Sequence, residues 1–321
     1  MQIILINAYY NLKERRSFLK QILLPLFTSL KDIDAIEYLF YHASIGRGDH
    51  FKILFKLTTN DLTVEKFILD NIDRLIKENP STTTNDEIRS YFKSFPNNSA
   101  HKTFYNSQKI FTPAIEVNAY LEKFVGICSI RTLSYINSFE HAEVLKLSIP
   151  LSNAVFNGFD IPIEARIHVI ESFLKRFHPT NNPTSIKDKN SRKEIANYLK
   201  KLTDGFRKDY HTNKTQYADY LNFSDSYQRE WAKEIENCCL EIRNTSIELL
   251  QQGNFKLPDD FTYDITSSVS VDQQVLLYVL SLTFSELMNC LLMEDEDLLA
   301  TACLLNEIYR EKIVSQVGVD N

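Results

Sequence analysis

The alternation of apolar and polar residues predicts strands early in the chain and helices later. Residues 2–8 form an almost continuously apolar run, which is typical of a strand covered on both faces. Apolar residues at spacings of three and four then indicate amphipathic helices, and two aromatic-rich runs indicate a hairpin. The predicted order is a strand over 2–8, a helix over 13–30, strands over 35–44 and 50–57, and a helix over 63–78.

Beyond residue 80 the pattern becomes helical. Thr84 and Glu87 form a capping box for a further helix, and the pattern over 102–120 indicates one or two more strands. We therefore expect an α+β fold with a small β-α-β-β-α sheet layer followed by a larger, mostly helical region. We expect a sheet part over 1–125 and a helical part over 126–321, packed together as one unit. The predicted later helices cover 127–147, 162–177, 191–202, 212–221, 225–251, 271–292 and 296–313.

Composition narrows the function classes. Seven glycines in 321 residues are too few for the glycine-rich loops of dinucleotide-binding folds or for a turn-dense β-sandwich. A net charge of −6 argues against general nucleic-acid binding. Five cysteines at irregular spacing make a poor disulfide framework, and no apolar run is long enough to span a bilayer. Because the chain also begins with a strand-like run rather than a signal peptide, we expect a cytoplasmic protein.

The second hairpin strand carries the most informative polar pattern. Side chains alternate across a strand, so the core face consists of Phe51, Ile53, Phe55 and Leu57. The opposite face carries His50, Lys52, Leu54 and Lys56, with His42 and Arg47 close by across the turn. Such a row of cations could hold a carboxylate, a phosphate or a peptide C-terminus. The alternative is an ordinary strand surface that faces solvent.

This hairpin, from Tyr41 to Lys56, also resembles a known motif. It is similar to the R-Y…G-x-H-I-R-L-R-F hairpin of the C-terminal elimination domain of lantibiotic dehydratases and of the stand-alone thiopeptide-type bacteriocin biosynthesis proteins. The turn supplies Gly46 and Gly48, where that family keeps a glycine beside its histidine. The resemblance is specific over residues 35–57 and architectural elsewhere.

The resemblance implies an activity on a ribosomally made precursor peptide. Members of the family remove glutamate from glutamylated serine and threonine, which leaves dehydroamino acids. Elimination needs cations for the glutamyl carboxylates and a group that exchanges protons near neutral pH. A relative of the same fold closes the pyridine ring of thiopeptides, which depends mainly on positioning a dehydrated peptide.

The hairpin residues of the family map onto this chain in part. His50 falls on the hairpin histidine, and Lys52 falls on the first arginine, where it keeps the charge but not the bidentate fork. Leu54 replaces the second arginine.

Two further family elements map onto single residues. The second element falls near residues 111–118, where Glu116 stands for one of its acids. The third falls on the last helix, where Asn306 is kept while Ala302 and Glu307 replace a histidine and an arginine. Elimination, cyclisation and peptide binding without chemistry therefore all remain open.

Other candidate sites have simpler interpretations. His141 and His168 each lie near a glutamate at helical spacing, but one pair supplies too few ligands for a metal. Residues 192–214 are basic and contain aromatic residues, and a solvated helix face explains them better than RNA contact.

These observations lead to one set of expectations. We expect a peptide-tailoring protein that needs no cofactor or metal, binds a precursor peptide with its leader, and works beside a separate glutamylating dehydratase. We expect no direct contact with nucleic acid or membrane, and the sequence permits a homo-oligomer. The expected catalytic residues are His50, Lys52, Arg47 and Glu116, and the expected substrate-binding residues are His42, Lys56 and Asn306.

Overall fold

The structure, a computed structural model, places the chain in two compact units. One unit runs over residues 1–139 and 289–292, and the other over 140–288 and 293–321. The structure describes residues 2–44, 50–81, 96–104, 111–112, 114–138, 141–176, 189–221, 223, 226–257, 271–291 and 295–317.

The first unit contains an antiparallel sheet with the strand order β2-β3-β1-β4. Its strands are β1 (Gln2–Tyr9), β2 (Ile36–Ser44), β3 (His50–Leu57) and β4 (Ser99–Thr103). Both predicted hairpin strands and the N-terminal strand are therefore confirmed. The core face predicted for β3 is also confirmed, because Phe51, Ile53, Phe55 and Leu57 are fully buried.

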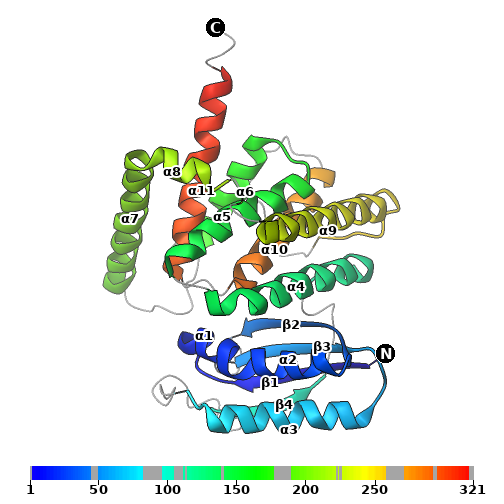
Figure 1. The fold of residues 1–321 in the computed structure, drawn as a ribbon. Helices are drawn as coiled ribbons and strands as arrows, with labels where there is room; N and C mark the ends of the chain where they lie inside the picture. The colour runs from blue at the N-terminus through cyan, green and yellow to red at the C-terminus, as the bar shows by residue number, and fades with distance from the viewer. Residues whose placement is uncertain are drawn as a thin grey trace. The chain divides into compact units, whose positions relative to one another are not determined.

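Helices cover this core face. A helical segment runs through a 3-10 turn (Leu12–Glu14), α1 (Arg15–Phe18), a π-helical turn (Leu19–Leu23) and α2 (Leu24–Asp32). Phe18 stacks on Phe51 with 4.2 Å between ring centroids, which joins this segment to β3. Helix α3 (Leu62–Glu78) lies along β4, and α2 lies in front of the sheet in the view of Figure 1.

Helix α4 (Ile115–Tyr135) packs along β2, the edge strand of the sheet. The Ser129 hydroxyl accepts a hydrogen bond from the Tyr41 backbone N–H, so α4 satisfies a group that this edge would otherwise expose. A Cβ atom on Gly126 would lie 3.4 Å from the Tyr38 ring, which shows how closely helix and strand approach. The helix begins after a clamp in which Asn118 exchanges two hydrogen bonds with the backbone of Thr112.

The second unit is helical and is built around α11. Nearly every side chain of α11 from Leu299 to Tyr309 is buried. This is typical of a helix that is apolar on all sides. Helices α5, α6, α7 and α8 all pack against it. The helices of this unit are α5 (His141–Gly158), α6 (Ile163–Arg176), α7 (Lys189–Thr212), α8 (Lys214–Asp219), α9 (Ser226–Gln251), α10 (Val271–Cys290) and α11 (Asp295–Val317).

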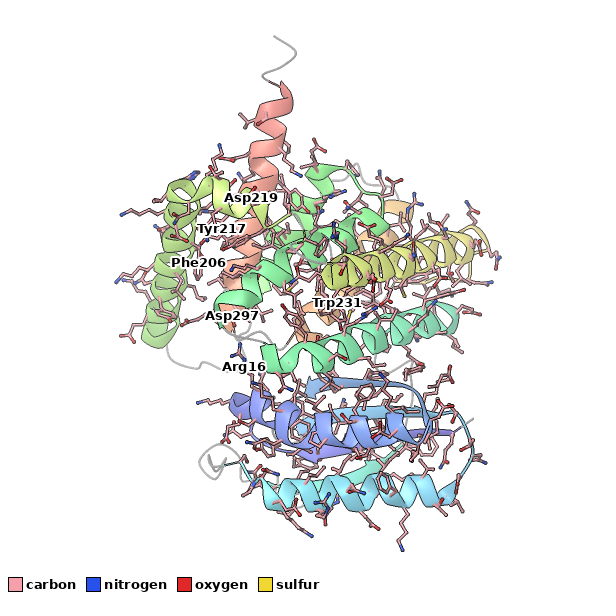
Figure 2. All side chains as sticks on the ribbon, in the orientation of Figure 1. Arg16, Phe206, Tyr217, Asp219, Trp231 and Asp297 are labelled. Atoms are coloured by element: carbon pink, nitrogen blue, oxygen red, sulfur yellow. The ribbon has the colours of Figure 1, made fainter. Side chains whose placement is uncertain are left out.

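Helices α7 and α8 are joined to α11 by polar contacts as well as by apolar packing. Glu307 of α11 pairs with Arg207 at 3.1 Å, and Glu311 pairs with Lys214 at 2.7 Å. Figure 2 shows Phe206 and Tyr217 on the side of α7 and α8 that faces α11.

The α+β fold is confirmed, but two element predictions are wrong. The predicted helix over 127–147 is two helices, α4 and α5, because the chain passes through a 3-10 turn at Ile136–Ser138. Asparagine and serine in that turn compete for backbone hydrogen bonds and so favour a break. The strand pattern expected over 102–120 is confirmed at residues 102–103 of β4 and is wrong from Ile115 on, where α4 begins. Residues 105–110 and 113 lie outside the described residues. The capping box at Thr84 and Glu87 lies outside the described residues.

The expected division at residue 125 would cut α4, whereas the compact units keep all of α4 with the sheet. Within the described residues, no helix is long and apolar enough to cross a membrane.

Candidate functional site

A row of polar side chains crosses all four strands on the sheet face opposite Phe51. The strand register pairs His42 of β2 with Lys52 of β3, Lys52 with Asn7 of β1, and Asn7 with His101 of β4. Directly paired residues project from the same face with Cβ atoms about 5 Å apart. We call these four residues the polar rung. It combines one ammonium group, two imidazoles and one amide within a single row.

The neighbouring row adds aromatic and hydroxyl groups. His50 pairs with Tyr9, and their ring centroids lie 5.1 Å apart. Tyr9 also meets His101 edge-on at 5.9 Å, and the Ser99 hydroxyl lies 3.0 Å from His101 Nε2. His50 is only 2% exposed, so its ring packs inside the protein and does not face solvent.

Lys52 and Asn7 each carry a polar group of the polar rung that no described residue satisfies. Lys52 is half-buried and makes no ion pair or hydrogen bond with any residue that the structure describes. Asn7 Oδ1 is buried and accepts no hydrogen bond from the described residues. A buried acceptor without a partner is costly, so its retention in a strand suits a site that a ligand completes.

Farther along β3, Lys56 has protein partners. It pairs with Glu37 at 2.7 Å and lies 4.9 Å from the centroid of the Tyr38 ring. Tyr38 in turn donates a 2.9 Å hydrogen bond to Glu122 of α4. Burial raises the pKa of Glu122, while the hydrogen bond from Tyr38 and the charge of Lys56 partly oppose that rise. Burial, and then the Glu122 charge, raises the pKa of Tyr38. Lys56 therefore takes part in a structural network, unlike Lys52.

The other expected site residues lie in different environments. Glu116 is exposed in the first turn of α4, where its charge complements the helix dipole. Asn306 belongs to the second unit, is 2% exposed and accepts a 3.1 Å hydrogen bond from Arg310. Arg47 lies outside the described residues. The polar rung thus brings together His42 and Lys52, with His50 in the adjacent row.

The sequence analysis did not predict Asn7, His101 or Tyr9 as site residues. Asn7 interrupts the apolar run that follows Gln2 in this strand, and that interruption is a signal that could have indicated it. His101 could not have been placed, because its position depends on the pairing of β4 with β1.

The described residues contain no group of three or more histidine, cysteine, aspartate or glutamate side chains that could hold a metal ion. Glu171, which follows His168 by three residues, pairs with Arg310.

Comparison with known proteins shows that other proteins share this fold. No protein-family model matches the chain, and no curated protein matches it. Among solved structures, the chain is similar to a pyridine synthase, TbtD, from thiomuracin biosynthesis, with a TM-score of 0.65 and 14% identity over 97% of this chain and 98% of that one. The chain shares the fold of this synthase.

Two further solved structures have the same fold. TsrL matches with a TM-score of 0.59 and 11% identity over 97% of this chain and 95% of that one. The tRNA-dependent lantibiotic dehydratase MibB from Microbispora sp. 107891 matches with a TM-score of 0.55 and 8% identity. That match covers 98% of this chain but only 28% of MibB. The fold expected from the hairpin resemblance is therefore confirmed.

Proposed function

We propose that this chain is a tailoring protein for a ribosomally made peptide of the lanthipeptide or thiopeptide type, and that the polar rung binds the side chain being modified. The observation that carries this proposal is Lys52, which pairs with no described residue, beside the Asn7 carbonyl, which accepts no hydrogen bond from the described residues. The fold is shared almost end to end with a pyridine synthase from thiomuracin biosynthesis. Lys52 supplies a positive charge for a carboxylate, and Asn7 supplies an acceptor for a peptide N–H.

The polar rung contains the groups that glutamate elimination needs. Lys52 would hold a carboxylate of the glutamyl group, and His42, its half-buried neighbour on β2, would act as the base. The imidazole takes the proton from the α-carbon, and the electron pair of that C–H bond forms the double bond between the α- and β-carbons. The bond from the β-carbon to oxygen then breaks, and glutamate leaves as a carboxylate.

A second candidate is closure of a pyridine ring on an already dehydrated peptide. The sequence favours it, since the polar strand face carries Lys52 and Leu54 where the eliminating family carries arginines. Ring closure would use the same face mainly to position the peptide.

Mass spectrometry of one precursor peptide in three states would test the proposal. The protein is incubated with the unmodified, glutamylated and dehydrated forms of a precursor encoded beside it. Loss of glutamate from the second form supports elimination, and a change in the third form alone supports ring closure. Binding without a mass change supports a peptide-carrying subunit that works with a separate dehydratase. Neither binding nor a mass change with any of the three forms would refute a tailoring role.

A further inference from the structure

A second polar site lies in the helical unit, around the buried ring of Tyr309. The Tyr309 hydroxyl donates a 2.7 Å hydrogen bond to Asn153 Oδ1 of α5. Arg166 of α6 lies with its guanidinium carbon 5.6 Å from the centroid of the Tyr309 ring, and Lys312 lies with its ammonium nitrogen 5.9 Å from the same centroid. Two positive charges are thus gathered at one aromatic ring.

Neutral oxygens hold Arg166 in position. Its Nε donates to the Ile161 carbonyl at 3.1 Å, and its Nη1 donates to Asn153 Oδ1 at 3.2 Å and Asn157 Oδ1 at 3.0 Å. A side-chain hydrogen bond with Tyr309 adds to these three. The guanidinium is therefore oriented before any ligand arrives.

No carboxylate neutralises this pair of cations among the described residues. Neither Arg166 nor Lys312 forms an ion pair there. The carboxylate of Glu236 lies nearby, but it accepts a 3.1 Å hydrogen bond from the Asn157 amide instead. Other arginines of the same unit do have acidic partners, as Arg207 has Glu307 and Arg310 has Glu171.

The pKa values of Lys312 and Tyr309 are consistent with an excess of positive charge around the Tyr309 ring. Burial and the charge of Arg166 lower the pKa of Lys312. Burial raises the pKa of Tyr309 to about 12, against the opposing charge of Arg166. An anion that contacts both cations would relieve their mutual repulsion.

We propose that Arg166 and Lys312 form a carboxylate-binding site on the second unit. The guanidinium of Arg166 and the ammonium of Lys312 would each donate to the ligand, which suits the two oxygens of one carboxylate. Half-exposed Arg166 and exposed Lys312 leave the site open to an acidic side chain of a bound peptide or to a small free carboxylate.

Fluorescence anisotropy with a defined probe tests this site. The probe is a labelled, acetylated and amidated peptide of alternating glycine and glutamate, and its glutamine counterpart measures binding without carboxylates. We expect the glutamate peptide to bind, with citrate competing. Arg166→Gln and Lys312→Gln should each weaken binding about tenfold, the usual loss for one charge-assisted hydrogen bond. Citrate protection against thermal unfolding without peptide binding would assign the site to a small free carboxylate.

Matched variants make the test decisive. Lys208→Gln removes an exposed lysine of α7 that has no ion pair with a described residue, so it controls for net charge. Lys312→Gln alters an exposed side chain and guards against a folding defect in Arg166→Gln. Arg166→Lys keeps the positive charge but loses the planar guanidinium, so its affinity should lie between that of the natural protein and that of Arg166→Gln. Unchanged binding in both glutamine variants, an equal loss in Lys208→Gln, or equal competition by inorganic phosphate would overturn the proposal.

Discussion

Asn7 on β1 is the direct cross-strand partner of Lys52 on β3, and both side chains project from the sheet face opposite Phe51. Each carries a polar group that no described residue satisfies, namely the amide oxygen of Asn7 and the ammonium of Lys52. The buried oxygen of Asn7 lowers the stability of the free protein, and a ligand that donates to it recovers that loss, whereas the ammonium of half-buried Lys52 can be hydrated. Substitutions at these two residues should therefore reduce activity without destabilising the fold.

Replacing Lys52 with glutamine should abolish tailoring while leaving the fold intact. The variant loses the only cation of the polar rung but breaks no described ion pair or hydrogen bond. We expect the free energy of unfolding to change by no more than about 0.5 kcal/mol. Lys56→Gln is the matched control on the same strand, since it breaks the ion pair with Glu37 yet should retain tailoring. Full activity in Lys52→Gln would exclude the polar rung as the site.

Replacing Asn7 with leucine should raise stability and reduce activity together. Leucine has nearly the shape of asparagine and removes a buried acceptor that has no described partner, so unfolding should cost about 1 kcal/mol more. Chemical denaturation measures this gain, and the precursor assay measures the loss of activity. A loss of stability would show that the Asn7 amide has a structural role, contrary to the assignment made here.

The contrast between β1 and β4 shows how far the sequence could lead. The hairpin strands, the N-terminal strand and the helix over 62–78 follow from local periodicity, because each buries one recognisable face. The order β2-β3-β1-β4 depends on pairing between distant segments, which no local pattern encodes. Lys52 and His42 could therefore be found from the hairpin alone, whereas His101 joins them only through the placement of β4.

The same limit applies to burial. Alternation predicts that His50 and Lys52 share a face, and the register confirms it, but alternation does not indicate what covers that face. His50 proves to be buried beside Tyr9, while Lys52 keeps part of its surface.

Thiol labelling should distinguish folded from unfolded protein sharply. All five cysteines are free and buried, and burial raises the pKa of Cys303 to about 11. The reactive species is the thiolate, so iodoacetamide at pH 8 should leave the native protein unlabelled. Mass spectrometry should find five labels after denaturation. Rapid labelling of any thiol in the native state would contradict the burial described above.

The stability contribution of Glu122 should depend on pH. Burial raises its folded pKa above the ordinary value of 4.5, so the folded state retains a proton that the unfolded state has lost over the interval between the two values. Stability therefore falls as pH rises through that interval, and the loss persists at neutral pH. Glu122→Gln keeps an acceptor for Tyr38 and should be more stable than the natural protein at pH 7.

Denaturation at several pH values checks this expectation. The difference between Glu122→Gln and the natural protein should close as pH is lowered below 4.5, where both side chains are neutral. Glu116→Gln, in the exposed first turn of the same helix, controls for the loss of one negative charge. A difference that does not change with pH would rule out the buried carboxyl as its origin.

Two glycines in helices should respond to the same substitution in opposite directions. A Cβ atom on Gly158, at the end of α5, would lie 2.5 Å from the Glu236 carbonyl oxygen and from Cys239 Cβ of α9. Gly158→Ala should therefore force the helices apart and lower the free energy of unfolding by about 1–3 kcal/mol. Gly205 lies inside α7 with nothing within 4 Å of its added Cβ, so Gly205→Ala should raise the free energy of unfolding by about 0.5–1 kcal/mol through helix propensity. Denaturant titration of the two variants measures both changes, and a gain of stability in Gly158→Ala would refute the close packing of α5 on α9.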